Sequence, residues 1–193
     1  VPEEINRRII DHLSDIHLAY TEHARRYLLR EGIHGGHIFV VGSPMPEVLQ
    51  KHMQKIDESP VLQELGVNPQ EYMLVSAHRE ENVDEDRRFM PLMRALNALA
   101  ERYQMPMVFS THPRTWKRIE QKGFSFHPLV RNLRPFGFCD YIKLQKNAFC
   151  VLSDSGTLSE ESAILGFPAV LLRDSTERPE VLDKGTMVLG GVT

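Results

Sequence analysis

The stretch SDSGTLSEESAILGFPAVLLRDSTERPE (153–180) decides the fold of this chain. The residues before it, Phe149–Leu152, form a short apolar run rich in strand-forming residues, which predicts a buried strand. Asp154-Ser155-Gly156 then breaks the strand, and Thr157 and Glu160 have the spacing of a capping box, which predicts the start of a helix. Because another apolar run follows the helix, the sequence predicts a strand, a tight turn, a helix and a second strand.

The same alternation extends through the rest of the chain. Apolar runs bounded by turn residues predict further strands at Ile16–Tyr20, Ile38–Val41, Tyr72–Ser76, Pro106–Ser110 and Thr186–Leu189. Apolar residues at helical spacing predict helices at Glu3–Ser14, Glu22–Arg30 (capped by Thr21), Glu47–Ile56, Arg87–Tyr103, Pro113–Lys122 and Phe138–Asn147, and 59–70 is expected to be a loop with a short helix. This alternation indicates an α/β fold, a Rossmann-like doubly wound parallel sheet with right-handed crossovers.

Composition excludes several classes of function. The chain has 193 residues, 41% of them hydrophobic, and a net charge of -3, so no basic surface for nucleic acid is expected. No apolar run approaches the length that spans a membrane. Cys139 and Cys150 are too far apart for a metal motif or a disulfide framework, which favours reduced thiols in a cytoplasm. His34 and His37 lie in the glycine-containing turn IHGGH, and no metal site is expected there.

The turn at 154–157 has the features of an anion site. A strand that leads through small residues into a helix N-terminus exposes backbone N–H groups, and Glu161 lies one turn further along. Such an arrangement suits the phosphates and the ribose of a nucleotide. An ordinary capped turn of an α/β protein would show the same pattern of residues. His78 and Arg79 also follow a predicted strand, where they could donate to a diphosphate or belong to a charged surface loop. No dinucleotide fingerprint, P-loop or serine-hydrolase motif is present, and no cofactor is expected.

Several segments resemble one family. SAHREEN (76–82), STHPRT (110–115), PFGFCDYIKLQKNAFCVLSDSGT (135–157) and TERPE (176–180) resemble the non-hydrolysing UDP-N-acetylglucosamine 2-epimerases. They look most like the branch that makes UDP-N-acetyl-L-fucosamine for surface polysaccharides such as capsule and O-antigen. The resemblance implies a GT-B architecture of two Rossmann-like domains in a cytoplasmic homodimer. Residues 1–42 would then be the end of the first domain and the connection between domains, and 43–193 a C-terminally truncated UDP-binding domain.

The resemblance also implies roles for single residues. His78 matches a catalytic histidine near the diphosphate of the substrate. The positions that match UDP-binding or substrate-binding residues are Tyr141 at the uracil, Ser155, Gly156 and Thr157 at the diphosphate, Glu161 at the ribose hydroxyls, and Arg178. Glu160 is expected to act only as a helix cap.

Two further positions match a regulatory site. Arg79 and His112 correspond to residues that, in some members, line a site for a second UDP-N-acetylglucosamine between the domains. The neighbours of His112 are Pro113-Arg114-Thr115, which departs from the pattern of those members and favours the fucosamine branch.

The implied reaction is inversion at C2 of a UDP-N-acetylhexosamine, by elimination and re-addition of UDP. The resemblance implies that the acid and base carboxylates lie in the first domain, before Val1, so this chain alone is expected to be inactive. Two alternatives remain open at this point. A UDP-sugar glycosyltransferase of the GT-B type would also bind UDP through a helix carboxylate, and a nucleotide-sugar-binding module would do so without catalysis.

Overall fold

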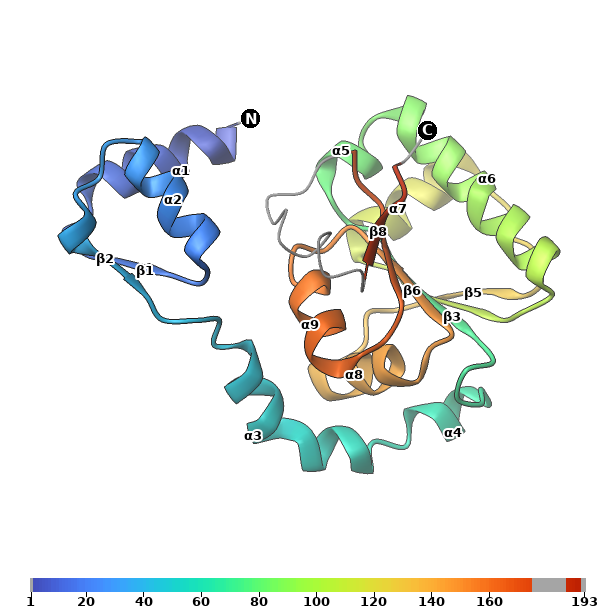
Figure 1. Cartoon of the computed structure of the whole chain (residues 1–193). Coiled ribbons are helices and arrows are strands. Elements are labelled where there is room, and N and C mark those ends of the chain that lie inside the picture. The colour runs from blue at the N-terminus through green and yellow to red at the C-terminus, as the bar shows by residue number, and fades with distance from the viewer. Residues whose placement is uncertain (1, 175–186, 192–193) are drawn as a thin grey trace. The chain divides into compact units, whose positions relative to one another are not determined.

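The structure is a computed structural model that describes residues 2–174 and 187–191 (Figure 1). It divides into two compact units, Val1–Val48 and Leu49–Thr193. Arg178 and the segment 176–180, which were predicted to contribute to the site, lie outside the described residues. None of the helices in the described ranges is long and apolar enough to cross a membrane.

The first unit is small. It contains α1 (Pro2–Leu13), β1 (His17–Ala19), α2 (Glu22–Arg30), the 3-10 turn η1 (Gly35–His37) and β2 (Ile38–Val40). The two strands pair in parallel. The predicted cap of α2 is confirmed, because the Thr21 hydroxyl accepts a hydrogen bond from the Ala24 N–H at 3.2 Å. A small core of Ala19, Leu28 and Ile38 holds the unit together.

The second unit is a parallel α/β sheet. Its elements are α3 (Met45–Glu58, which begins in the first unit), α4 (Val61–Leu65), β3 (Met73–Ser76), α5 (Glu80–Val83), α6 (Asp86–Tyr103), β4 (Met107–Ser110), α7 (Pro113–Lys122), β5 (Val130–Leu133), α8 (Phe138–Asn147), β6 (Cys150–Ser153), α9 (Leu158–Leu165), β7 (Ala169–Leu171) and β8 (Met187–Leu189). The strand order is β5-β4-β3-β6-β7-β8, with every pair parallel. Counted from β3, this is the 3-2-1-4-5-6 order of a Rossmann fold.

Apolar side chains cover both faces of this sheet. Met73 and Val75 of β3 belong to one buried cluster with residues of α6 and α7. Leu74 lies between them in sequence and belongs to a second cluster with residues of α8 and α9. Figure 1 shows α6 and α7 on one side of the sheet and α8 and α9 on the other. A parallel sheet covered in this way exposes mainly its edges and the ends of its strands.

Two elements of the second unit were not predicted. The edge strand β5 has the sequence VRNL, and its two central polar residues, Arg131 and Asn132, hide the apolar signal of a strand. The short helix α5 lies within the charged segment after β3 that reads as a loop, and no side chain caps it. The helices and strands that were predicted are present, and their ends differ from the predicted ends by at most two residues.

Candidate functional site

The sheet topology brings two of the predicted site segments to one edge. β3 and β6 are neighbours, with Ser76 opposite Ser153, and the strand order reverses between them. His78 follows β3, while Ser155 and Gly156 follow β6. In doubly wound sheets a ligand crevice lies outside the carboxyl ends of the strands at such a reversal. The candidate site therefore lies at the carboxyl ends of β3 and β6, where this fold favours ligand binding.

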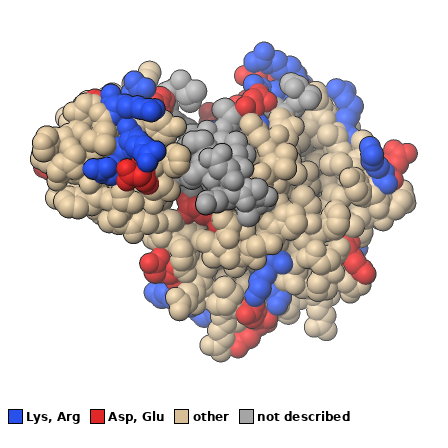
Figure 2. Space-filling model, viewed as in Figure 1, with Lys and Arg blue, Asp and Glu red and all other residues tan. Residues whose placement is uncertain are grey.

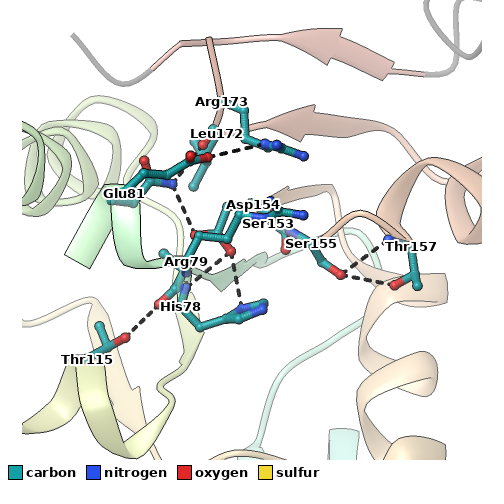
Figure 3. Close-up of polar contacts among 12 residues, drawn as sticks. His78, Arg79, Glu81, Thr115, Ser153, Asp154, Ser155, Thr157, Leu172 and Arg173 are labelled. Carbon is teal, nitrogen blue, oxygen red and sulfur yellow. Dashed lines mark hydrogen bonds and ion pairs between the residues drawn. The ribbon is translucent and has the colours of Figure 1, made fainter. Parts of the chain in front are cut away.

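Asp154 lies at the centre of this edge, and its side chain is fully buried (0% exposed) (Figure 3). The backbone N–H groups of His78 and Arg79 donate to its Oδ2 at 3.0 and 2.9 Å. The Asn82 side-chain amide donates to the same oxygen at 3.1 Å. The His78 ring also approaches the carboxylate, with Nδ1 3.2 Å from Oδ1. These contacts provide the polar partners that a buried carboxylate requires, and they join the segment after β3 to the turn after β6.

Further bonds brace the segment after β3. The Asn82 amide also donates to the Leu172 carbonyl at 2.9 Å, which reaches the end of β7. The Thr115 hydroxyl donates to the Ala77 carbonyl at 2.8 Å, which reaches α7. Asn82 and Thr115 are both fully buried, so residues 77–82 are held both to the end of β7 and to α7. Pre-organised backbone of this kind is typical of a binding site.

The turn after β6 differs from its prediction in one detail. The capping box of Thr157 and Glu160 is wrong, because Thr157 has helical backbone angles and makes no side-chain cap hydrogen bond. Its hydroxyl lies 3.0 Å from the Ser155 hydroxyl, which also accepts the Thr157 N–H at 3.4 Å. The local Ser–Thr contact has taken the place of the cap.

Gly156 is not required by its own surroundings. Its φ is not positive, and a Cβ at this position would lie an ordinary 3.6 Å from Arg79 Nη2. Among the described residues, no acceptor meets its N–H group. Neither backbone strain nor packing within the described chain therefore requires glycine here, whereas the close approach of a ligand to the backbone would.

Glu161 and Tyr141 lie close to the turn. Glu161 is buried (7% exposed), and its Oε2 accepts a hydrogen bond of 2.7 Å from the Gln145 amide. Burial raises the pKa of Tyr141, and the negative charges of Glu161 and Asp154 raise it further. Side-chain interactions with Ser76 and Ser153, the last residues of β3 and β6, partly oppose the rise in the pKa of Tyr141.

The two positions expected at a regulatory site lie at the same edge. The Arg79 Nε donates to the Asp154 carbonyl at 3.0 Å, which sets the guanidinium beside the 154–156 turn. His112 caps α7 by accepting the Arg114 N–H at its Nδ1, and its ring centroid is 6.2 Å from that of His78. The described geometry thus groups Arg79 and His112 with His78.

Three contributors to the site were not foreseen from the sequence: Asp154, Asn82 and Gln145. The sequence indicated that Asp154 ends a strand, that Asn82 belongs to a charged loop, and that Gln145 belongs to a helix. The sequence did contain one indication of the role of Asp154. This residue directly follows a predicted buried strand, and polar residues follow a neighbouring predicted strand. Such a carboxylate is at the ligand edge of the sheet and needs partners there.

The described residues contain no group of three or more His, Cys, Asp or Glu side chains that could hold a metal ion. On the face shown in Figure 2, acidic and basic side chains lie in small mixed groups, without a broad basic field of the kind that binds nucleic acid. The polar groups at the sheet edge are instead suited to a small ligand with negative charge and hydroxyl groups.

Comparisons with known proteins identify the family of the chain. The sequence model of the family described as UDP-N-acetylglucosamine 2-epimerase matches residues 1–193. A curated UDP-N-acetylglucosamine 2-epimerase of Methanocaldococcus jannaschii is 37% identical over 99% of this chain and 54% of its own length.

Solved structures give the same result. The structure of UDP-N-acetylglucosamine 2-epimerase from Rickettsia bellii is 46% identical, with a TM-score of 0.86 over 100% of this chain and 51% of that chain. The Methanocaldococcus jannaschii enzyme in complex with UDP-GlcNAc and UDP is 36% identical, with a TM-score of 0.91 over 100% of this chain and 54% of that chain. The expected α/β fold class, that of the GT-B-type epimerases, is confirmed. The chain spans about half the length of these relatives, and it belongs to the UDP-N-acetylglucosamine 2-epimerase family.

Proposed function

We propose that this chain is the UDP-binding part of a UDP-N-acetylhexosamine 2-epimerase that supplies precursors for surface polysaccharides. One observation supports the proposal most directly. The glycine-containing turn at 154–157 and the buried carboxylate of Glu161 lie together where the strand order reverses. Gly156 brings the backbone of the turn close to the Arg79 guanidinium, and Glu161 lies on the helix that starts at the same turn. A nucleotide diphosphate requires both kinds of group, because its phosphates need donors and its ribose hydroxyls need an acceptor.

Each site residue has a task in this proposal. Ser155, Gly156 and Thr157 bind the diphosphate at the N-terminus of α9, and His78 contacts it from β3. Glu161 accepts the ribose hydroxyls, and the bond from Gln145 to its Oε2 leaves Oε1 for that purpose. We assign Tyr141 to the uracil side of the site and Arg178 to the substrate.

The reaction explains why the diphosphate must be held so firmly. A base removes the proton at C2, UDP leaves C1, and a glycal stays bound beside the UDP. The proton then returns to the other face of C2 while UDP adds back. Because a C2 proton is weakly acidic, elimination is slow unless the charge on the departing diphosphate is stabilised. His78 and the helix N-terminus at 155–157 would supply that stabilisation.

The finer parts of the proposal concern the whole protein. Residues 1–42 would belong to an N-terminal Rossmann-like domain and 43–193 to the UDP-binding domain, in a cytoplasmic homodimer. The acid and base carboxylates would come from outside this chain. The sugar would be that of the fucosamine branch, and Arg79 and His112 would line a site for a second UDP-sugar.

Calorimetric titration with UDP, UMP and uridine tests the placement of the diphosphate. We expect UDP to bind most tightly, because each charge-assisted hydrogen bond contributes about 1.5–3 kcal/mol before ordering and desolvation costs. Equal affinities for the three ligands would mean that the phosphates make no contact with this site.

Two neighbouring carboxylates give a matched test of the ribose contact. Glu161→Gln keeps the shape of the side chain but removes its charge, and should weaken UDP binding by about 1.5–3 kcal/mol. Glu160→Gln, at a half-buried position on the same helix, should change UDP binding by less than about 0.5 kcal/mol. A larger loss for Glu160→Gln than for Glu161→Gln would contradict the assignment.

The activity of the chain is tested separately. Incubated with UDP-N-acetylglucosamine in deuterated water, the chain alone should neither invert C2 nor exchange the C2 proton, as followed by NMR. Turnover above the buffer control would show that the acid and base groups lie within this chain.

A further inference from the structure

We propose that Asp154 is a positioning residue that fixes the tautomer of His78. Its carboxylate holds the imidazole with Nδ1–H toward Oδ1, so that Nε2 is the only ring nitrogen left to meet a ligand. The functional part of this inference rests on the proposed UDP site, whereas the tautomer itself does not.

The contacts of Asp154 carry the first step. The carboxylate is fully buried, and its Oδ2 already accepts from the Arg79 N–H and the Asn82 amide. Oδ1 lies 3.2 Å from the His78 ring nitrogen Nδ1. Figure 3 marks this contact with a dashed line between the two side chains. An ionised carboxylate can only accept hydrogen bonds, so a favourable contact at this distance requires a proton on Nδ1.

The exposure of the ring carries the second step. Although Asp154 is buried, the His78 side chain is 43% exposed, so the ring extends from its buried partner toward solvent. When the ring is neutral, Nε2 accepts a hydrogen bond. When the ring takes up a proton, Nε2–H can donate to a phosphate oxygen while Nδ1–H keeps its partner. Asp154 thus decides which nitrogen serves the ligand.

Other histidines of the chain provide a contrast. In His34, His112 and His127 the Nδ1 atom accepts a backbone N–H, from Gly36, Arg114 and Leu129 respectively. An accepting Nδ1 carries no proton, so these rings have the opposite tautomer, with the proton on Nε2. His78 is therefore expected to differ from them within the same molecule.

NMR of the full chain with ¹⁵N-labelled histidine tests the tautomer directly, without ligand and at a pH where the rings are neutral. We expect His78, assigned with His78→Gln, to show a protonated Nδ1 and an unprotonated Nε2. His34, His112 and His127 should show the reverse pattern. A protonated Nε2 on neutral His78 would overturn the proposal, whatever UDP binding shows.

The variant Asp154→Asn tests the cause. Its side-chain amide can present an N–H to the ring, so the His78 pattern should shift toward protonated Nε2. Asp57→Asn, at an exposed carboxylate paired with Lys146, is the matched control and should leave the pattern unchanged. An unchanged tautomer in folded Asp154→Asn would contradict the proposal. If this variant does not fold, the wild-type spectrum still decides the tautomer.

A double-variant cycle separates positioning from mere bracing of the backbone. Asp154→Asn should weaken UDP binding roughly tenfold or more while leaving uridine binding unchanged. The variant removes the negative charge that pairs with a protonated His78 ring, and with it the charge-assisted contact from Nε2–H to a phosphate oxygen. In a His78→Gln background, the same change should have little further effect. An equal loss in both backgrounds would mean that Asp154 acts only through the backbone. Absence of UDP binding in the wild type would instead refute the proposed function and leave the tautomer result standing.

Discussion

Residues 49–193 and residues 1–48 are built from the same kinds of element, but they bury very different amounts of apolar surface. In the larger unit Phe109 of β4 is fully buried, and helices cover both faces of the sheet. In the smaller unit Leu18 and Phe39 are paired in register on β1 and β2, yet they are 63% and 50% exposed. An apolar strand residue is thus a core residue only where another layer covers its face.

The contrast has an energetic consequence. Parallel sheets occur almost only with both faces covered, and burial contributes roughly 25 cal/mol per Å² of apolar surface. The buried core of the first unit consists of Ala19, Leu28 and Ile38. On α1, four large apolar side chains are more than half exposed: Ile5, Ile9, Ile10 and Leu13. We therefore expect residues 1–48 to be the less stable part of this chain.

A pair of phenylalanine variants would show the largest difference between the units. Phe109→Ala removes a fully buried ring and should lower the free energy of unfolding by about 3–5 kcal/mol. Phe39→Ala removes a half-exposed ring and should lower it by less than about 1 kcal/mol. Chemical denaturation, followed by hydrogen exchange in each unit, measures both. Similar losses for the two variants would mean that the face of β1 and β2 is covered in solution.

UDP offers a second and smaller contrast. The described residues assigned to the nucleotide lie within 49–193, so UDP at a hundred times its dissociation constant should stabilise that unit by about 2.7 kcal/mol. Amides of β3, β6 and α9 should exchange more slowly with UDP, whereas those of β1 and β2 should not change. Equal protection of both units would contradict the comparison, and protection of neither would contradict the nucleotide site.

The sequence predicted most of the fold because local patterns determine most of its elements. Helix α7 was predicted at its observed ends, since Pro113 opens it and Gly123, with a φ of 57°, closes it. The edge strand β5 was missed because Arg131 and Asn132 interrupt its apolar pattern. Local reasoning therefore fails where an element is defined by its neighbours in the sheet.

The site shows the same limit more sharply. Motifs singled out His78, Ser155 and Glu161. The structure places the first two directly after β3 and β6, and Glu161 in the first turn of α9. Asp154 was passed over because its partners are distant in sequence: His78 is 76 residues away and Asn82 is 72. Contacts over such separations are set by the strand order, which no local pattern records.

Two helix caps, one in each unit, give the smallest predicted effect. Thr21 and Thr157 are both threonines at N-cap positions, and a pattern of residues alone treats them alike. In the structure, Thr21 has an extended backbone and its hydroxyl accepts the Ala24 N–H, whereas Thr157 is helical and caps nothing with its side chain. Thr21→Ala should therefore destabilise α2 by about 1 kcal/mol.

Thr157→Ala should change stability by less than about 0.5 kcal/mol, because it removes only an exposed hydroxyl contact with Ser155. Hydrogen exchange of the α2 and α9 amides reports the two effects separately. The loss at Thr21 should be confined to residues 1–48, because the bond it removes lies within that unit. If Thr157→Ala proved the more destabilising variant, the Thr157 hydroxyl would cap α9 in solution, and the turn would be arranged as the capping-box pattern predicts.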